Sequence, residues 1–152
     1  PTRRSSDLVM ENNSYRNSIE RYLERAKGDV WTIETKDNGQ QDVPAFEPFK
    51  HALKKKIAIG AVSHRSLQAD RPEDVAGEIR KALKYIPPER LVVSSDCGFG
   101  RQGCNREIAF YKASAIAQGC NIVRKELGLP TTYIPAADPR LQTDVKPRLK
   151  SS

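Results

Sequence analysis

The sequence predicts an α/β fold in which short parallel strands alternate with helices. Apolar residues recur at helical spacing in four segments, and short runs rich in β-branched residues lie between them. Prolines and glycines separate the two patterns. Because this alternation implies parallel strands joined by helical crossovers, a doubly wound sheet and a barrel both fit it. No glycine-rich dinucleotide fingerprint follows a predicted strand.

Each element is bounded by recognisable start and stop residues. The expected helices cover 13–26, 46–54, 70–86 and 105–127, and the expected strands cover 30–33, 56–62 and 91–93. Asp70 is predicted to cap the third helix, which has Pro72 near its first position, and Pro87 follows its end. Gly128 is the predicted stop of the last helix. A polar loop is expected over 94–100.

The two ends of the chain are expected to lie outside the folded domain. Residues 1–8 match the translation of a common sequencing-adapter oligonucleotide, and we interpret them as an artefact. Residues 9–128 are predicted to form the domain, and the proline-rich segment 129–152 is predicted to be an extended tail. Three strands cannot close a barrel of eight, so a barrel requires further strands upstream of this segment.

Composition is typical of a globular protein of the cytoplasm. The chain has 152 residues, of which 38% are hydrophobic and 30% charged. No apolar run approaches the roughly 20 residues that a spanning helix needs, so no membrane partner is expected. Three cysteines cannot all pair, which favours a reducing compartment. The net charge of +7 permits a nucleic acid or an anionic substrate, but the basic residues are dispersed apart from the run 54–56.

Three candidate functional residues follow the predicted strands: Glu34, His64 and Cys97. In parallel α/β folds, side chains just past the carboxyl ends of strands converge on one mouth, and glutamate, histidine and cysteine together form a metal-site composition. Structural roles remain open. Glu34 could cap a turn or pair with a lysine, His64 could be an ordinary loop histidine, and Cys97 could be a small buried hydrophobe. The polar, glycine-flanked setting Asp96-Cys97-Gly98 argues against a core position for the cysteine.

Two motifs give the chain a resemblance to a known family. Asp29 to Thr35, DVWTIET, resembles the segment of cobalamin-independent methionine synthases whose glutamate binds zinc. Ile86 to Leu91, IPPERL, followed by the SDCG that contains Cys97, resembles the last barrel strand of that family, whose cysteine is another zinc ligand. The motifs occur in the order of the family, and the resemblance runs over about 18–127.

The resemblance implies the C-terminal part of a (β/α)8 TIM barrel, with about three strand–helix units, and a zinc-dependent methyltransferase. Glu34 and Cys97 are then two ligands of Zn²⁺. Homocysteine and a methylfolate polyglutamate, 5-methyltetrahydropteroyl(tri)glutamate, are the implied small-molecule partners, and methionine is the product. His64 lies within about one residue of a family histidine thought to assist proton transfer, which makes it the candidate catalytic residue.

The chain also departs from the family pattern. The family's His-x-Cys ligand pair is absent, so those two ligands are expected upstream and the chain alone is expected to be inactive. Ser94-Ser95 stands where the family has Asn-Pro, and Cys104 and Cys120 match no ligand position. The tail is more like that of short single-barrel relatives, which include epoxyalkane:coenzyme M transferases. Zinc-dependent thiol transfer to an epoxide and a non-catalytic barrel fragment therefore remain alternatives. A basic nucleic-acid-binding module is a weaker one, because the sequence lacks aromatic residues interleaved with a basic stripe, and no nucleic-acid partner is expected.

Overall fold

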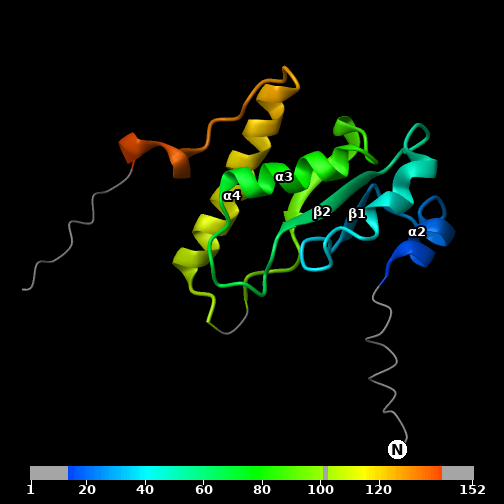
Figure 1. The fold of residues 1–152 in the computed structure, drawn as a ribbon, viewed down its shortest axis with the longest axis horizontal. Helices are drawn as coiled ribbons and strands as arrows, with labels where there is room; N and C mark the ends of the chain where they lie inside the picture. Colours follow the sequence, from blue (N-terminus) through cyan, green and yellow to red (C-terminus); the bar gives the residue numbers. More distant parts are fainter. Residues whose placement is uncertain (1–13, 101–102, 142–152) are drawn as a thin grey trace, which may run out of the picture.

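A three-stranded sheet with helices packed on it forms the centre of the molecule (Figure 1). The computed structural model describes residues 14–100 and 103–141, so the predicted artefact at 1–8 and the tail beyond residue 141 lie outside the described residues. The elements are α2 (Arg16–Tyr22), β1 (Val30–Ile33), η1 (Val43–Phe49), β2 (Lys56–Val62), α3 (Pro72–Leu83), η2 (Pro88–Arg90), β3 (Leu91–Ser95), α4 (Arg106–Glu126), η3 (Pro135–Ala137) and η4 (Pro139–Leu141).

The strands are parallel and lie in the order β1-β2-β3, which confirms the predicted α/β class. The central strand β2 pairs with both neighbours, through Val30↔Lys56 on one side and Ile57↔Leu91 on the other. Every residue of β2 after Lys56 is buried, as its nearly continuous apolar run predicts for a strand covered on both faces. Because all three strands run the same way, their carboxyl ends lie at one edge of the sheet.

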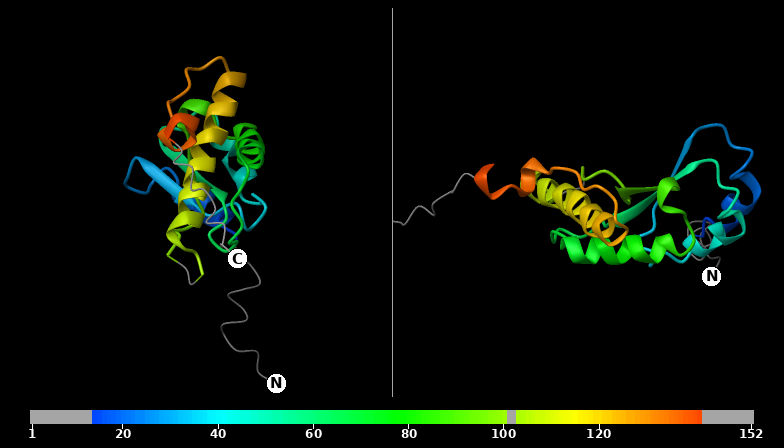
Figure 2. Two further views of the ribbon diagram at one scale, coloured as in Figure 1. Left: turned by 90° about the vertical axis from the view of Figure 1, so that its left-hand side faces the viewer. Right: turned by 90° about the horizontal axis from the view of Figure 1, so that it is seen from above.

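Helices α3 and α4 pack against each other and against the sheet (Figure 2). The predicted apolar stripe of α3 is buried at Val75, Ile79 and Ala82. The two helices approach closely at Gly119 of α4, where an added Cβ atom would lie 2.6 Å from Cγ1 of Val75. The apolar stripe of α3 therefore forms the centre of one of the two hydrophobic clusters of the molecule.

The predicted N-cap of α3 is wrong. Arg71 occupies the cap position and makes no capping hydrogen bond through its side chain. Asp70 instead accepts a 2.8 Å hydrogen bond from Nζ of Lys112, a fully buried lysine of α4. The reason is electrostatic: a buried ammonium group needs a charged partner, and Asp70 is that partner.

The boundaries of four elements differ from the prediction, and α3 is one of them, since it covers Pro72–Leu83 rather than 70–86. The first helix ends at Tyr22, well before residue 26. The helix expected over 46–54 is a 3-10 helix at Val43–Phe49, because Pro48 lies inside it and has no N–H for a regular helical ladder. Strand β3 extends to Ser95, since β2 offers hydrogen-bonding partners as far as Val62. The last helix agrees with the prediction, and Gly128 follows it at φ 69°.

The described part of the C-terminal tail lies along α4. It contains two 3-10 turns. Asn121 of α4 donates to the carbonyl of Thr132 at 2.7 Å and accepts from its N–H at 2.9 Å. Among the residues described, no helix combines the length and the apolar character needed to cross a bilayer.

Candidate active site

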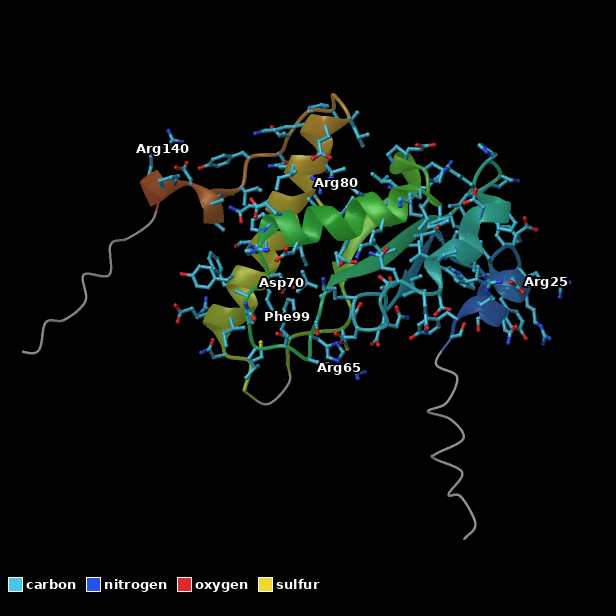
Figure 3. All side chains as sticks on the ribbon, viewed as in Figure 1. Arg25, Arg65, Asp70, Arg80, Phe99 and Arg140 are labelled. Carbon is cyan, nitrogen blue, oxygen red and sulfur yellow. The ribbon has the colours of Figure 1, made fainter. Side chains whose placement is uncertain are left out.

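The structure brings the segments of all three predicted site residues to one edge of the sheet. Glu34 directly follows β1, His64 lies just beyond the end of β2, and Cys97 lies just beyond the end of β3. Because the three strands are parallel neighbours, these positions are adjacent. Figure 3 shows Arg65 and Phe99 at this edge, with Arg25 at the opposite end of the sheet.

The carboxylate of Asp96 links the ends of β1 and β3. Its Oδ1 atom accepts hydrogen bonds from the backbone N–H groups of Thr35 at 2.7 Å and Lys36 at 2.8 Å, and its Oδ2 atom accepts one from Asp37 at 2.8 Å. Thr35 follows Glu34 in the sequence, and Asp96 precedes Cys97. The two predicted metal ligands therefore flank a direct hydrogen bond between the turn after β1 and the end of β3.

Helix α3 holds the same turn from the other side. Glu78 accepts hydrogen bonds from Nζ of Lys36 at 3.1 Å and from Nε2 of Gln40 at 2.8 Å. The backbone of Gln40 has a φ of 62°, a left-handed conformation that is uncommon for a residue with a side chain. Its N–H donates to the carbonyl of Thr35 at 2.8 Å, which closes the turn. The backbone that carries Glu34 is thus fixed by contacts with two other elements.

His64 is not an ordinary exposed loop histidine. Only 5% of its surface is exposed, and its Nδ1 atom is buried without a hydrogen-bond partner among the described residues. That nitrogen lies 3.8 Å from Oδ2 of Asp37, which is also 3.4 Å from Nε of Arg65. The imidazole therefore lies beside a carboxylate at the carboxyl ends of the strands.

Ligand atoms of Asp37, His64 and Asp96 lie within 4.8 Å of one another, so this trio could hold a metal ion by distance alone. The carboxylate of Asp96, however, already accepts three backbone hydrogen bonds. These bonds use three of the roughly four acceptor positions of a carboxylate, so a cation would have to share Oδ2 with the N–H of Asp37 or displace an N–H group. Asp96 is therefore better suited to holding the turn than to ligating a metal.

Glu34 and Cys97 fit a zinc site by their chemistry. Glu34 is half-buried and Cys97 is exposed, so the interpretation of Cys97 as a buried hydrophobe is wrong. In the described ranges, no hydrogen bond or ion pair engages the carboxylate of Glu34 or the thiol of Cys97. A carboxylate and a thiolate are both common ligands of Zn²⁺. Two accessible, unengaged donors on adjacent strand ends are therefore compatible with the metal.

The surroundings of Cys120 differ from those of the exposed Cys97. Cys120 lies within α4 and packs partly against the hydrophobic cluster between α3 and α4. Burial raises the pKa of its thiol above the ordinary value, although Arg124 acts in the opposite direction. A metal ligand needs the thiolate form, so Cys120 is disfavoured as a ligand.

Sequence reasoning did not identify Asp37, Asp96 or Tyr15 as residues near the candidate site. Burial raises the pKa of Tyr15 above its ordinary value, and the carboxylates of Glu34, Asp42 and Asp96 raise it further. The position of Asp96 beside Cys97 at a strand end was a usable signal. Tyr15 and Asp37 lie in segments with no comparable pattern.

Comparison with known proteins identifies the family. The family model described as the catalytic domain of cobalamin-independent synthase matches residues 12–117. The chain belongs to the cobalamin-independent methionine synthase family. Methionine synthase of Thermococcus kodakarensis is 31% identical over 106 residues, which are 70% of this chain and 30% of that protein. Methionine synthase of Saccharolobus solfataricus is 35% identical over 78 residues, 51% of this chain and 23% of that protein.

A solved structure of the family shares the fold. The B12-independent methionine synthase from Shewanella sp. W3-18-1, in complex with selenomethionine, aligns with a TM-score of 0.64 at 25% identity. The alignment covers 80% of this chain and 35% of that one. The predicted family resemblance is therefore confirmed. The chain spans about a third or less of the length of the cobalamin-independent synthases it matches.

Proposed function

We propose that the complete protein containing this chain transfers a methyl group from 5-methyltetrahydropteroyl(tri)glutamate to homocysteine, and that the chain forms the C-terminal part of its (β/α)8 barrel. The observation that carries the proposal is the placement of Glu34 and Cys97 on either side of the Thr35–Asp96 hydrogen bond, in a chain that belongs to this family. The matched relatives are named methionine synthase, and the solved relative is in complex with selenomethionine, a close analogue of the product.

Glu34 and Cys97 supply two ligands for Zn²⁺ in this proposal. The remaining protein ligands come from outside this segment in this proposal, since the His-x-Cys pair of the family is absent from it and a catalytic zinc site needs at least three protein donors. Bound zinc favours the thiolate form of the substrate thiol, which is the reactive nucleophile. The exposure of Cys97 matches a site that a small molecule must reach.

His64 is the proposed proton donor. A sulfur–carbon bond forms as the bond between N5 of the folate and its methyl group breaks, and the electron pair of that bond stays on N5. Because N5 is a poor leaving group until it is protonated, a proton must be supplied there. The buried imidazole of His64, beside the carboxylate of Asp37, is a group at this mouth that can hold such a proton.

The assignment of the ligands is tested by substitution in the complete protein. Cys97→Ser should lose most bound zinc and nearly all methyl transfer, because a hydroxyl is a poor ligand compared with a thiolate. Glu34→Gln should weaken both properties less completely. Cys104→Ser is the matched control and should keep both. Metal analysis that finds unchanged zinc in Cys97→Ser would refute the assignment.

A further inference from the structure

We propose that Asp96 is a positioning residue of the metal site, whose carboxylate sets the separation between Glu34 on the turn after β1 and Cys97 after β3. The proposal rests on the proposed function, because it takes Glu34 and Cys97 to be zinc ligands. It adds a residue that does not touch the metal and acts through the backbone of its neighbours.

The hydrogen bonds of Asp96 constrain the turn along its length. The carboxylate accepts from Thr35, Lys36 and Asp37, the three consecutive residues that follow Glu34. Hydrogen bonds to a charged acceptor are stronger than neutral ones. Asp96 and Thr35 are buried, so water competes poorly for the hydrogen bond between them. Since Cys97 follows Asp96 directly, these hydrogen bonds connect the backbone that carries Glu34 with the backbone that carries Cys97.

Gly60 of β2 provides the space that this arrangement needs. A Cβ atom at residue 60 would lie 1.8 Å from Oδ1 of Asp96 and 2.8 Å from its Cα atom. The carbonyl of Gly60 accepts a 2.7 Å hydrogen bond from Oγ1 of Thr35. A glycine weakens the middle of a strand but permits a close approach of another group. All three strand ends therefore meet at the carboxylate of Asp96.

A metal site tolerates only small displacements of its ligands. Zinc takes carboxylate and thiolate ligands at about 2.0–2.3 Å. Functional constellations must be held within about 0.5 Å of their productive geometry. Loss of the Asp96 hydrogen bonds should therefore weaken zinc binding even though Glu34 and Cys97 are unchanged.

The test uses the complete protein with four substitutions. Asp96→Ala removes all acceptors for the turn, whereas Asp96→Asn keeps one oxygen and presents an amide donor to the remaining N–H. Gly60→Ala displaces the carboxylate without removing it. Gly77→Ala is the matched glycine control, because no heavy atom lies within 4 Å of a Cβ atom added there.

Three readouts separate a positioning role from a purely structural one. Zinc Kd is measured by chelator competition, ligand geometry by the absorption of the Co²⁺-substituted protein, and the hydrogen bonds by amide exchange at residues 35–37. Asp96→Ala and Gly60→Ala should raise the zinc Kd by about 10–100-fold, the range for residues that support metal ligands. Both should change the Co²⁺ spectrum and accelerate exchange. Asp96→Asn should be intermediate, and Gly77→Ala should match the wild type.

The outcomes distinguish this inference from the proposed function. Unchanged zinc Kd and Co²⁺ spectrum in Asp96→Asn and Gly60→Ala, with faster exchange at 35–37, would overturn the positioning role and leave the zinc assignment intact. A wild-type protein that binds no zinc would overturn the proposed function and this inference together. If Asp96→Ala does not fold, the milder Asp96→Asn decides between these outcomes, because it keeps an acceptor for part of the turn.

Discussion

At the residue scale, the environment of His64 bears on two roles that the sequence left open. The side chain is buried, and its Nδ1 atom faces Asp37 at 3.8 Å without a hydrogen bond among the described residues. An unpaired buried nitrogen has a free-energy cost, which a purely structural histidine would normally avoid through a hydrogen bond. The unpaired nitrogen is therefore consistent with the proposed role of His64 in proton transfer.

His64→Asn should leave zinc bound and lower turnover by roughly 10²–10⁴-fold, the usual range for a lost general acid. Asparagine cannot hold an ionisable proton at this position. Steady-state kinetics and zinc analysis of the purified complete protein measure both effects. His51→Asn is the control, since His51 is exposed near the amino ends of the strands, and it should behave as the wild type. Loss of zinc in His64→Asn would make His64 a ligand, and unchanged turnover would exclude it from proton transfer.

At the scale of elements, the packing of α3 on α4 depends on a glycine. An added Cβ atom at Gly119 would lie 2.6 Å from Cγ1 and 2.7 Å from Cβ of Val75, and 3.0 Å from the carbonyl oxygen of Pro72. The last of these atoms belongs to the backbone and cannot rotate away. Steric exclusion at this helix contact should therefore outweigh the preference of helices for alanine.

Gly119→Ala should lower the free energy of unfolding. Overpacking costs about 1–3 kcal/mol, and the higher helix propensity of alanine offsets at most about 1 kcal/mol. Gly77→Ala in α3 introduces the same methyl group where no heavy atom lies within 4 Å. It should stabilise the protein by about 0.5–1 kcal/mol, since only the propensity changes. Denaturant unfolding of both variants measures the change in the free energy of unfolding. Equal changes would show that the close contact at Gly119 does not determine the packing.

The ion pair between Lys112 and Asp70 holds the loop before α3 against α4. Asp70→Ala should lower the free energy of unfolding by about 3–5 kcal/mol, because it leaves the fully buried ammonium group without its charged partner. Replacing both residues, with Lys112→Met and Asp70→Asn, should cost less than Asp70→Ala alone. The exposed Arg71–Asp74 pair is the control, and Asp74→Asn should change stability little. Thermal unfolding of the Asp70→Ala, double and Asp74→Asn variants ranks their stabilities. An Asp70→Ala protein as stable as the wild type would contradict this prediction.

At the scale of the whole molecule, the sheet has two open edges in the described structure. Strands β1 and β3 each have a hydrogen-bonded neighbour on one side. Unpaired edges favour association with other chains, and barrels remove them by closure. Several large apolar side chains are also exposed, namely Tyr22, Phe110, Tyr111, Leu127, Leu129 and Tyr133. These features support the proposal that further strands of the same protein complete a barrel.

Residues 9–152 expressed alone should aggregate or form a loosely packed state without tight zinc. The open edges would remain unpaired, and two proposed ligands are too few to offset the cost of ordering the site. Thermal unfolding and zinc stoichiometry of this segment are compared with those of the complete protein. A cooperative monomer with one tightly bound zinc ion would show that the segment is a complete domain.

Local patterns were sufficient to predict the α/β class and the family of the chain. The apolar run of β2, the helical periodicity of α3 and the stop at Gly128 all act over a few residues, so they can be read directly from the chain. The motifs around Glu34 and Cys97 led to the family for the same reason. Because the strands are parallel, the strand ends next to Glu34 and Cys97 lie on the same side of the sheet.

The contacts between these elements could not be read from local patterns. Asp96 and Thr35 are 61 residues apart in the sequence, and Asp70 and Lys112 are 42 apart. Neither pair has a periodicity that marks it, because each partner is selected by proximity after the chain has folded. Asp70 was therefore assigned to a helix cap, and the carboxylate of Asp96 was passed over beside Cys97. Buried charges are paired with whatever partner the packing brings within reach, and the tertiary structure alone supplies that information.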